Sequence, residues 1–121
     1  MSYGYEKPLF WVASSKKDLT AMPEEVQDAF GFALHLAQNG SKHPNTKPLK
    51  GFGGTGVMEV VEDFSGNAYR AIYTARFGSA LYVLHCFQKK STKGIQTPLH
   101  EIATIKMRFI AAEQHSKGSP T

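Results

Sequence analysis

Four side chains in two neighbouring stretches of the sequence have types suited to chemistry on phosphate: Arg70, His85, Lys89 and Lys90. A guanidinium can hold two phosphate oxygens with its planar fork, and an ammonium adds a point charge. The imidazole of His85 titrates near neutral pH, so it is a candidate for proton transfer. A lysine crowded by other cations has a lowered pKa, so Lys89 or Lys90 is another candidate for that step. Together the two stretches predict a small sheet that presents cations to a polyanion.

Each of these residues also has a purely structural interpretation. Arg70 can form an ion pair with Glu59 or Glu62 on a neighbouring strand. Strict alternation places His85 on the face that carries Val83, Phe87 and Lys89, where a histidine is commonly a satisfied core residue. The lysine pair can be a solvated loop pair. The sequence alone leaves both interpretations open.

The elements that must position these side chains follow from periodicity and capping signals. Helices are expected at 16–21, with Ser14 or Ser15 as cap, and from Pro23 to a stop at Asn39 and Gly40. Strands are expected at 8–13, 57–63, 69–77 and 80–88, the last three forming an antiparallel meander. A helix with an apolar stripe begins after Thr97 and frays after Glu113. This pattern predicts an α+β domain.

Two glycine-containing stretches are expected to be connections. Residues 41–56 hold four glycines and two prolines, which precludes a long helix and favours a flexible connection into the sheet. The glycines lack the following Gly-Lys-Ser/Thr of a phosphate loop and the helix that a dinucleotide loop needs. Gly78 and Ser79 suit a two-residue hairpin turn between the second and third strands of the meander.

Composition limits the class of protein. The 121 residues fit one domain, 1–121, with flexible ends at 1–7 and 114–121. Cys86 is the single cysteine, expected to be buried and inert, and no metal site is expected. The chain has no long apolar run and no secretory signal, so a cytoplasmic location without membrane attachment is expected. Net charge is +4, composed of −2 over residues 1–40 (3 basic, 5 acidic) and +6 over 41–121 (11 basic, 5 acidic), a distribution typical of nucleic-acid binding.

An ordered set of short motifs connects the sequence to a known family. The motifs are Lys-Pro-Leu-Lys-Gly-Phe at 47–52, Val-Met-Glu-Val at 57–60, Tyr-Arg-Ala-Ile-Tyr at 69–73, Tyr-Val-Leu-His-Cys-Phe-Gln-Lys-Lys-Ser at 82–91, Thr-Pro at 97–98, and Arg108. In this order they resemble the RelE/HigB-like toxins of type II toxin–antitoxin systems, in particular the phage-derived RelE-like branch of the RelE/ParE superfamily. The resemblance covers residues 8–113. It implies a RelE/ParE-like fold, in which an N-terminal helical hairpin packs on a small, mainly antiparallel sheet with a C-terminal helix.

The resemblance also implies an activity and partners. Such proteins are typically ribosome-dependent, metal-independent mRNA endoribonucleases that inhibit translation and need no cofactor. They are held inactive by a cognate antitoxin, often a helix-turn-helix DNA-binding protein. The partners expected here are therefore an antitoxin and mRNA on the ribosome. The apolar residues Phe30 and Phe32, and the stripe of the last helix, are candidate antitoxin contacts.

Residue roles follow from the match. In this cleavage the 2′-hydroxyl attacks the adjacent phosphorus, so the enzyme must align oxygens, neutralise charge and move two protons. Arg70 matches the strand arginine of the family and is expected to stabilise the transition state. Lys89 and Lys90 are expected at the scissile phosphate and flanking backbone, while three further lysines are expected to contact RNA: Lys47, Lys50 and Lys93. Many relatives place a tyrosine or histidine near the C-terminus that helps the chemistry, whereas here no tyrosine follows Thr97 and the histidines are His100 and His115. The general base is therefore unassigned: His85 or a lysine serves, or catalysis is weak, or the protein acts without cutting RNA.

Two other functions fit the same sequence. A ParE-like inhibitor of DNA gyrase would share the fold but would not need Arg70 and the lysine pair to converge. A non-catalytic module for RNA or an antitoxin would lose affinity in proportion to charge when Arg70 is replaced, without losing any chemistry.

Overall fold

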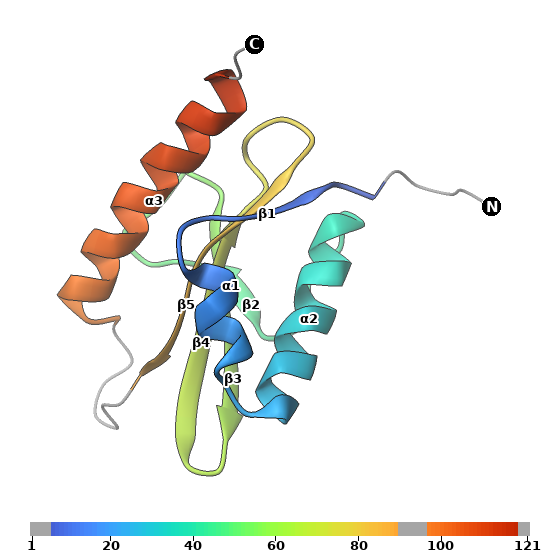
Figure 1. Cartoon of the computed structure of the whole chain (residues 1–121), viewed down its shortest axis with the longest axis vertical. Helices are drawn as coiled ribbons and strands as arrows, with labels where there is room; N and C mark the ends of the chain where they lie inside the picture. The colour runs from blue at the N-terminus through green and yellow to red at the C-terminus, as the bar shows by residue number, and fades with distance from the viewer. Residues whose placement is uncertain (1–5, 90–96, 119–121) are drawn as a thin grey trace.

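The structure, a computed structural model, describes residues 6–89 and 97–118 and has the expected α+β composition (Figure 1). Its elements are β1 (Leu9–Trp11), α1 (Ser15–Thr20), α2 (Glu24–Gln38), β2 (Thr46–Pro48), β3 (Val57–Phe64), β4 (Asn67–Thr74), β5 (Leu81–Lys89) and α3 (Leu99–Gly118). None of the helices in the described ranges is both long and apolar enough to cross a membrane.

The strands form one five-stranded mixed sheet in the order β1-β5-β4-β3-β2. The predicted antiparallel meander is confirmed as β3, β4 and β5. β1, also expected as a strand, pairs parallel to β5 and extends the sheet on that side. β2 pairs antiparallel with β3 inside the stretch that was expected to be a flexible connection. Pro48 is compatible with β2 because an edge strand has one side on which no N–H is needed.

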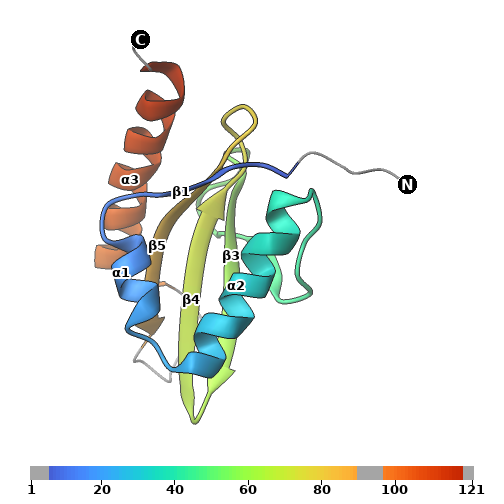
Figure 2. The same cartoon turned by 45° about the vertical axis from the view of Figure 1, so that its right-hand side comes forward.

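The helices cover opposite faces of the sheet (Figure 2). α1 packs on β5 and α2 on β3, whereas α3 packs on β5 from the other side. The core under α1 and α2 contains Val26, Phe30, Ala71 and Val83 among its buried members. A second core, under α3, is formed by apolar residues of three strands, the segment after β2, and the helix: Leu49, Phe52, Val57, Ile72, Ala80, Tyr82, Leu84, Phe87, Ile105 and Ala112.

A turn is present at Gly78 and Ser79, as predicted, but it is not a two-residue hairpin loop, because β4 ends at Thr74 and β5 begins only at Leu81. Thr74 Oγ1 accepts a hydrogen bond from the Arg76 backbone N–H, and Arg76 Nη1 donates to the Gly54 carbonyl oxygen at 2.8 Å. With these contacts the chain after Thr74 leaves the β4–β5 pairing before it reaches the turn. Gly78 has a φ of 69°, which favours glycine there.

The last helix is longer than expected, since α3 runs past Glu113 to Gly118. Its final turns have contacts that a fraying end would lack. Lys117 Nζ lies 3.3 Å from Glu113 Oε2, and the His115 ring is hydrogen-bonded to the Tyr82 hydroxyl at 2.8 Å.

A β-bulge in β5 changes which side chains share a face. Ile72 pairs with His85 and Tyr73 pairs with Val83, so Leu84 is the extra residue. The alternation expected for β5 is therefore wrong beyond Leu84: Cys86 joins the core under α1 and α2, while His85 lies on the α3 side. A bulge of this kind re-aims the side chains that follow it.

Candidate functional site

Four charged residues cross the α3 face of the sheet, one on each of four neighbouring strands: Lys47 on β2, Glu59 on β3, Arg70 on β4 and Lys89 on β5. Lys47 lies directly opposite Glu59. Arg70 pairs with Val61 and Lys89 with Ala68, so each is the diagonal neighbour of the next charged residue. We call these four residues the charged row. Residues that are far apart in sequence are thus brought together by the register of the strands.

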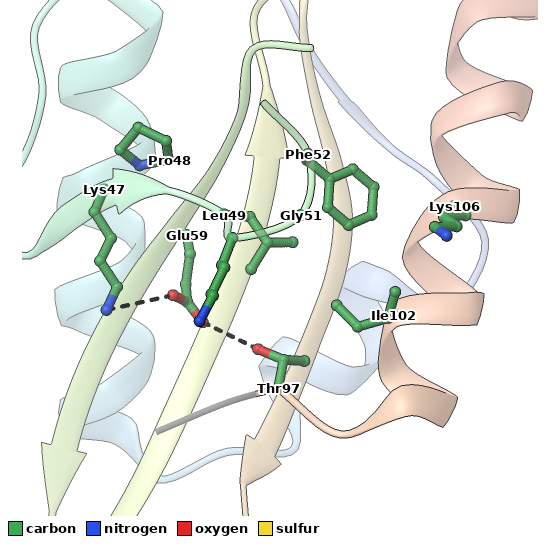
Figure 3. Close-up of a pocket in the computed structure, with 10 residues that line it drawn as sticks. Lys47, Pro48, Leu49, Gly51, Phe52, Glu59, Thr97, Ile102 and Lys106 are labelled. Atoms are coloured by element: carbon green, nitrogen blue, oxygen red, sulfur yellow. Dashed lines mark hydrogen bonds and ion pairs between the residues drawn. The ribbon is translucent and has the colours of Figure 1, made fainter. Parts of the chain in front are cut away.

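The row is centred on the carboxylate of Glu59. Arg70 Nη1 donates a hydrogen bond to Glu59 Oε2, and both side chains are buried. Lys47 Nζ lies 3.9 Å from Glu59 Oε1, and Thr97 Oγ1 lies 3.5 Å from Glu59 Oε2 (Figure 3). The ion pair foreseen for Arg70 is therefore made with Glu59; within the described residues, Glu62 is not within ion-pair distance of it. The row therefore combines three basic side chains with one carboxylate.

Two features of the row suit it to chemistry on a phosphate: a spare donor for a phosphoryl oxygen and a lysine that can accept a proton. Arg70 Nε is buried without a hydrogen-bond partner among the described residues. The pKa of Lys89 is lowered from its ordinary value by burial first, then by the nearby Arg70 and Lys47 cations, with Glu59 acting in the opposite direction. This is the direction expected for a crowded lysine, and it raises the fraction of neutral amine at a given pH.

His85 belongs to a different network. Its Nε2 lies 2.5 Å from Glu101 Oε1, and Arg108 Nη1 lies 3.2 Å from its Nδ1. Because an arginine can only donate, Nδ1 accepts and Nε2 carries the proton that points at Glu101. Arg108 also donates to the Leu84 carbonyl oxygen and to Ser14 Oγ, each at 3.1 Å. Both ring nitrogens are thus occupied, which favours a structural role for His85.

The structure does not bring His85 into the charged row. The ring of Phe87 stacks on that of His85 with centroids 4.9 Å apart, and Phe87 lies between His85 and Lys89 along the same face of β5. Sequence reasoning did not identify Glu101 and Arg108 as the partners of His85. The spacing of Glu101 and Arg108 was a possible signal, because the two residues are seven apart and therefore project from the same side of the helix.

The other expected RNA-contacting lysines have different positions. Lys50 is exposed and lines, with Lys47 and Lys106, a pocket of about 340 Å³ beside the row. Lys90 and Lys93 lie outside the described residues. No group of three or more histidine, cysteine or acidic side chains within 6–89 and 97–118 is arranged to hold a metal ion.

Two remaining expectations are resolved by burial. Cys86 is buried, which raises the pKa of its thiol to about 12 and makes it unreactive, as expected. Phe30 is completely buried in the core under α2, so it is not available as an antitoxin contact; Phe32, 55% exposed, is available. Of the stripe on α3, Ile105 is buried and Ile110 is exposed.

The sequence identifies a protein family that agrees with these observations. Residues 17–110 match the family described as Phage derived protein Gp49-like (DUF891), and the chain belongs to this family. Membership agrees with the resemblance to phage-derived RelE-like proteins and is compatible with a toxin of a toxin–antitoxin system. A search of curated proteins gives no significant match.

Proposed function

We propose that this protein is the toxin of a type II toxin–antitoxin system and that it cleaves mRNA on the ribosome, without a metal ion, to inhibit translation. The observation that carries the proposal is the charged row, in which cations from three strands converge on one face of a rigid sheet. A gyrase inhibitor would have no need for this convergence. The cognate antitoxin, in this proposal, covers the row or displaces an element beside it.

The row meets the requirements of the cleavage reaction. The ribose 2′-oxygen attacks the adjacent phosphorus, the bond to the 5′-oxygen breaks, and the products are a 2′,3′-cyclic phosphate and a 5′-hydroxyl. Arg70 supplies a fixed cation for the phosphoryl oxygens, and it is preorganised because Glu59 holds its guanidinium. Lys89, with its lowered pKa, takes the proton of the 2′-hydroxyl, and solvent water donates a proton to the departing 5′-oxygen, which leaves as the 5′-hydroxyl. Lys47 contacts a flanking phosphate from the exposed edge of the row.

Primer extension on translating ribosomes tests the proposal, with wild type compared with Arg70→Ala and Arg70→Lys. We expect codon-phased cuts with wild type, none with Arg70→Ala, and few with Arg70→Lys, because an ammonium cannot hold two phosphate oxygens in the same plane. Removing one preorganised donor of this kind costs roughly a hundredfold to a thousandfold in rate. Arg76→Ala is the matched control, since Arg76 is exposed and contacts the Gly54 carbonyl outside the row.

The outcomes separate the candidate functions. Cuts that persist in Arg70→Ala would leave the nuclease in place but remove Arg70 from its chemistry. A wild-type protein that makes no cuts yet arrests growth would refute the nuclease, and inhibition of DNA gyrase would then be assayed. Circular dichroism and thermal unfolding of each variant establish that a lost activity is not a lost fold.

A further inference from the structure

A pocket next to the charged row has a shape and lining that the proposed cleavage does not use. It lies between the segment after β2 and the first turns of α3 and has a volume of about 340 Å³ (Figure 3). Lys47 and Glu59 border it on one side and Phe52 and Ile102 on the other. Because Lys47 and Glu59 also belong to the row, the pocket opens directly beside the place proposed for the phosphates.

The floor and far wall of the pocket are apolar. Leu49 and Phe52 are buried and Ile102 is partly buried, all three within the core under α3. These residues are therefore fixed by packing before any ligand arrives. A rigid apolar slot with an aromatic ring in its wall suits a flat aromatic ligand, since unpaired bases gain affinity by packing against such surfaces.

The rim of the pocket is cationic. Lys47 and Lys50 flank it from the strand side, and Lys106 flanks it from α3. Lys50 and Lys106 are exposed, and neither has a carboxylate within ion-pair distance among the described residues. The buried carboxylate of Glu59 supplies an acceptor at its Oε1, which lies 3.9 Å from Lys47 Nζ on the strand side of the pocket. Together these features match the parts of a nucleotide. The apolar slot suits the base, the cationic rim suits the phosphates, and the Glu59 carboxylate suits an N–H group of the base.

We propose that this pocket holds one unpaired base of the RNA whose phosphates lie along the charged row. The inference rests on the proposed function, because it takes the row to be the phosphate site. It adds a requirement that the row alone does not impose: one nucleotide must leave its stack, enter the pocket to pack against Phe52 and Ile102, and present its N–H groups to Glu59 on the opposite side. The protein then binds single-stranded RNA through a base as well as through charge.

Binding to a non-cleavable RNA tests the pocket separately from catalysis. The probe is a single-stranded 2′-O-methyl hexanucleotide, which lacks the attacking hydroxyl, in an intact form and in six forms with one abasic position each. Fluorescence anisotropy gives the affinity, and the methyl resonances of Leu49 and Ile102 report the location. We expect one abasic position to weaken binding roughly tenfold, in line with the loss of one stacked base, and the intact probe to shift both methyl resonances.

Variants connect that position to the pocket. In Ile102→Trp, which fills the slot, the affinity for the intact probe is expected to fall to that for the abasic probe. Lys106→Glu is expected to weaken binding to every probe, whereas Lys16→Glu, the same charge change at an exposed position of α1 on the other face of the sheet, is expected to have no such effect. Equal affinities for all seven probes, or unshifted methyl resonances at saturation, would overturn the inference.

The two proposals fail in different ways. If Arg70-dependent cuts occur on ribosomes but base removal has no effect on binding, the proposed nuclease activity is supported and the proposed base pocket is refuted. If binding depends on one base and the methyl resonances shift, but the wild-type protein never cuts RNA, the base pocket is supported and the nuclease activity is refuted.

Discussion

The carboxylate of Glu59 determines whether Arg70 is held in place. Arg70 is buried beside two further cations, and Glu59 is its ion-pair partner in the described part of the chain. Sequence reasoning named this pair as one of two options but could not choose between Glu59 and Glu62, because the choice depends on strand register. It could not foresee the Thr97 contact either, since Thr97 follows β5 in the chain and reaches Glu59 only through tertiary folding.

Replacing Glu59 alone should be more harmful to stability than replacing the pair. Glu59→Gln leaves the Arg70 cation buried without its counter-charge, and we expect it to lower the free energy of unfolding by about 3–5 kcal/mol. The double variant Glu59→Gln/Arg70→Met removes both charges and should recover a large part of that loss. Urea denaturation measures all three proteins; a double variant less stable than Glu59→Gln would contradict this account.

The lowered pKa of Lys89 should give stability a distinct dependence on pH. Between the folded-state pKa and the ordinary value of 10.5, the unfolded chain binds more protons than the folded one. The free energy of unfolding therefore rises with pH through that window, as the buried amine loses its charge. Below the window Lys89 is protonated in both states, so it gives the free energy of unfolding no dependence on pH. Subtracting the unfolding free energy of Lys89→Met from that of wild type isolates the effect. A difference that stays flat or falls across the alkaline window would refute it.

At the scale of elements, α3 depends on polar anchors as much as on apolar packing. Ile105 and Ala112 are its buried residues within the described chain, while Glu101, Arg108 and His115 are hydrogen-bonded to β5. The bulge at Leu84 makes the central anchor possible, because it turns His85 toward the helix. Strict alternation correctly placed His85 on the face of Phe87 and Lys89 but wrongly added Val83, which lies on the other face, and no residue in β5 signals a bulge.

Loss of the central anchor should loosen α3 selectively. Arg108→Met removes the donors to His85, to the Leu84 carbonyl oxygen and to Ser14, and we expect a loss of about 1–3 kcal/mol because buried acceptors are left unsatisfied. Amide hydrogen exchange should accelerate along α3 more than along β4. Lys106→Met, on the exposed side of the same helix, is the control and should exchange like wild type. Uniform acceleration across all elements would show that Arg108 stabilises the whole domain instead.

The sequence predicts the central elements better than the edges. β3, β4 and β5 have long runs of strand-forming residues, and the ridge of α2 repeats at helical spacing, so local pattern and tertiary structure agree. β2 is a three-residue strand containing a proline, and its formation depends on the partner β3 rather than on its own residues. The parallel pairing of β1 likewise depends on a segment that lies far along the chain.

At the scale of the whole molecule, the charge is asymmetric in space as well as in sequence. The charged row and the pocket rim gather five cationic residues on the α3 side: Lys47, Lys50, Arg70, Lys89 and Lys106. The acidic first turn of α2 lies with a helix on the opposite face of the sheet. The excess of basic residues after position 40 predicted a polyanion partner, but only the fold shows which of these cations act together.

This asymmetry should appear as a salt dependence of RNA binding. For single-stranded RNA the slope of log affinity against log salt is about −0.7 for each phosphate neutralised. Lys47→Ala should therefore make the slope shallower by about 0.7, whereas Lys16→Ala, on α1, should leave it unchanged. Anisotropy titrations of the 2′-O-methyl hexanucleotide at several salt concentrations give both slopes. Equal slopes for wild type and Lys47→Ala would remove Lys47 from the RNA interface.

The pairing of β1 with β5 has a consequence for how the protein folds while it is being synthesised. β1 can pair only after β5 has been synthesised, because Leu9 pairs with Leu81 and Ser15 Oγ donates a hydrogen bond to the Val83 carbonyl oxygen. Contacts of such sequence separation form late, since the intervening loop must be closed first. Lys89 and Lys106 are also made after Arg70. A partly synthesised chain that ends before β5 therefore contains Lys47, Glu59 and Arg70 without Lys89 and Lys106, and the site is assembled only after β5 and the first half of α3 have been made.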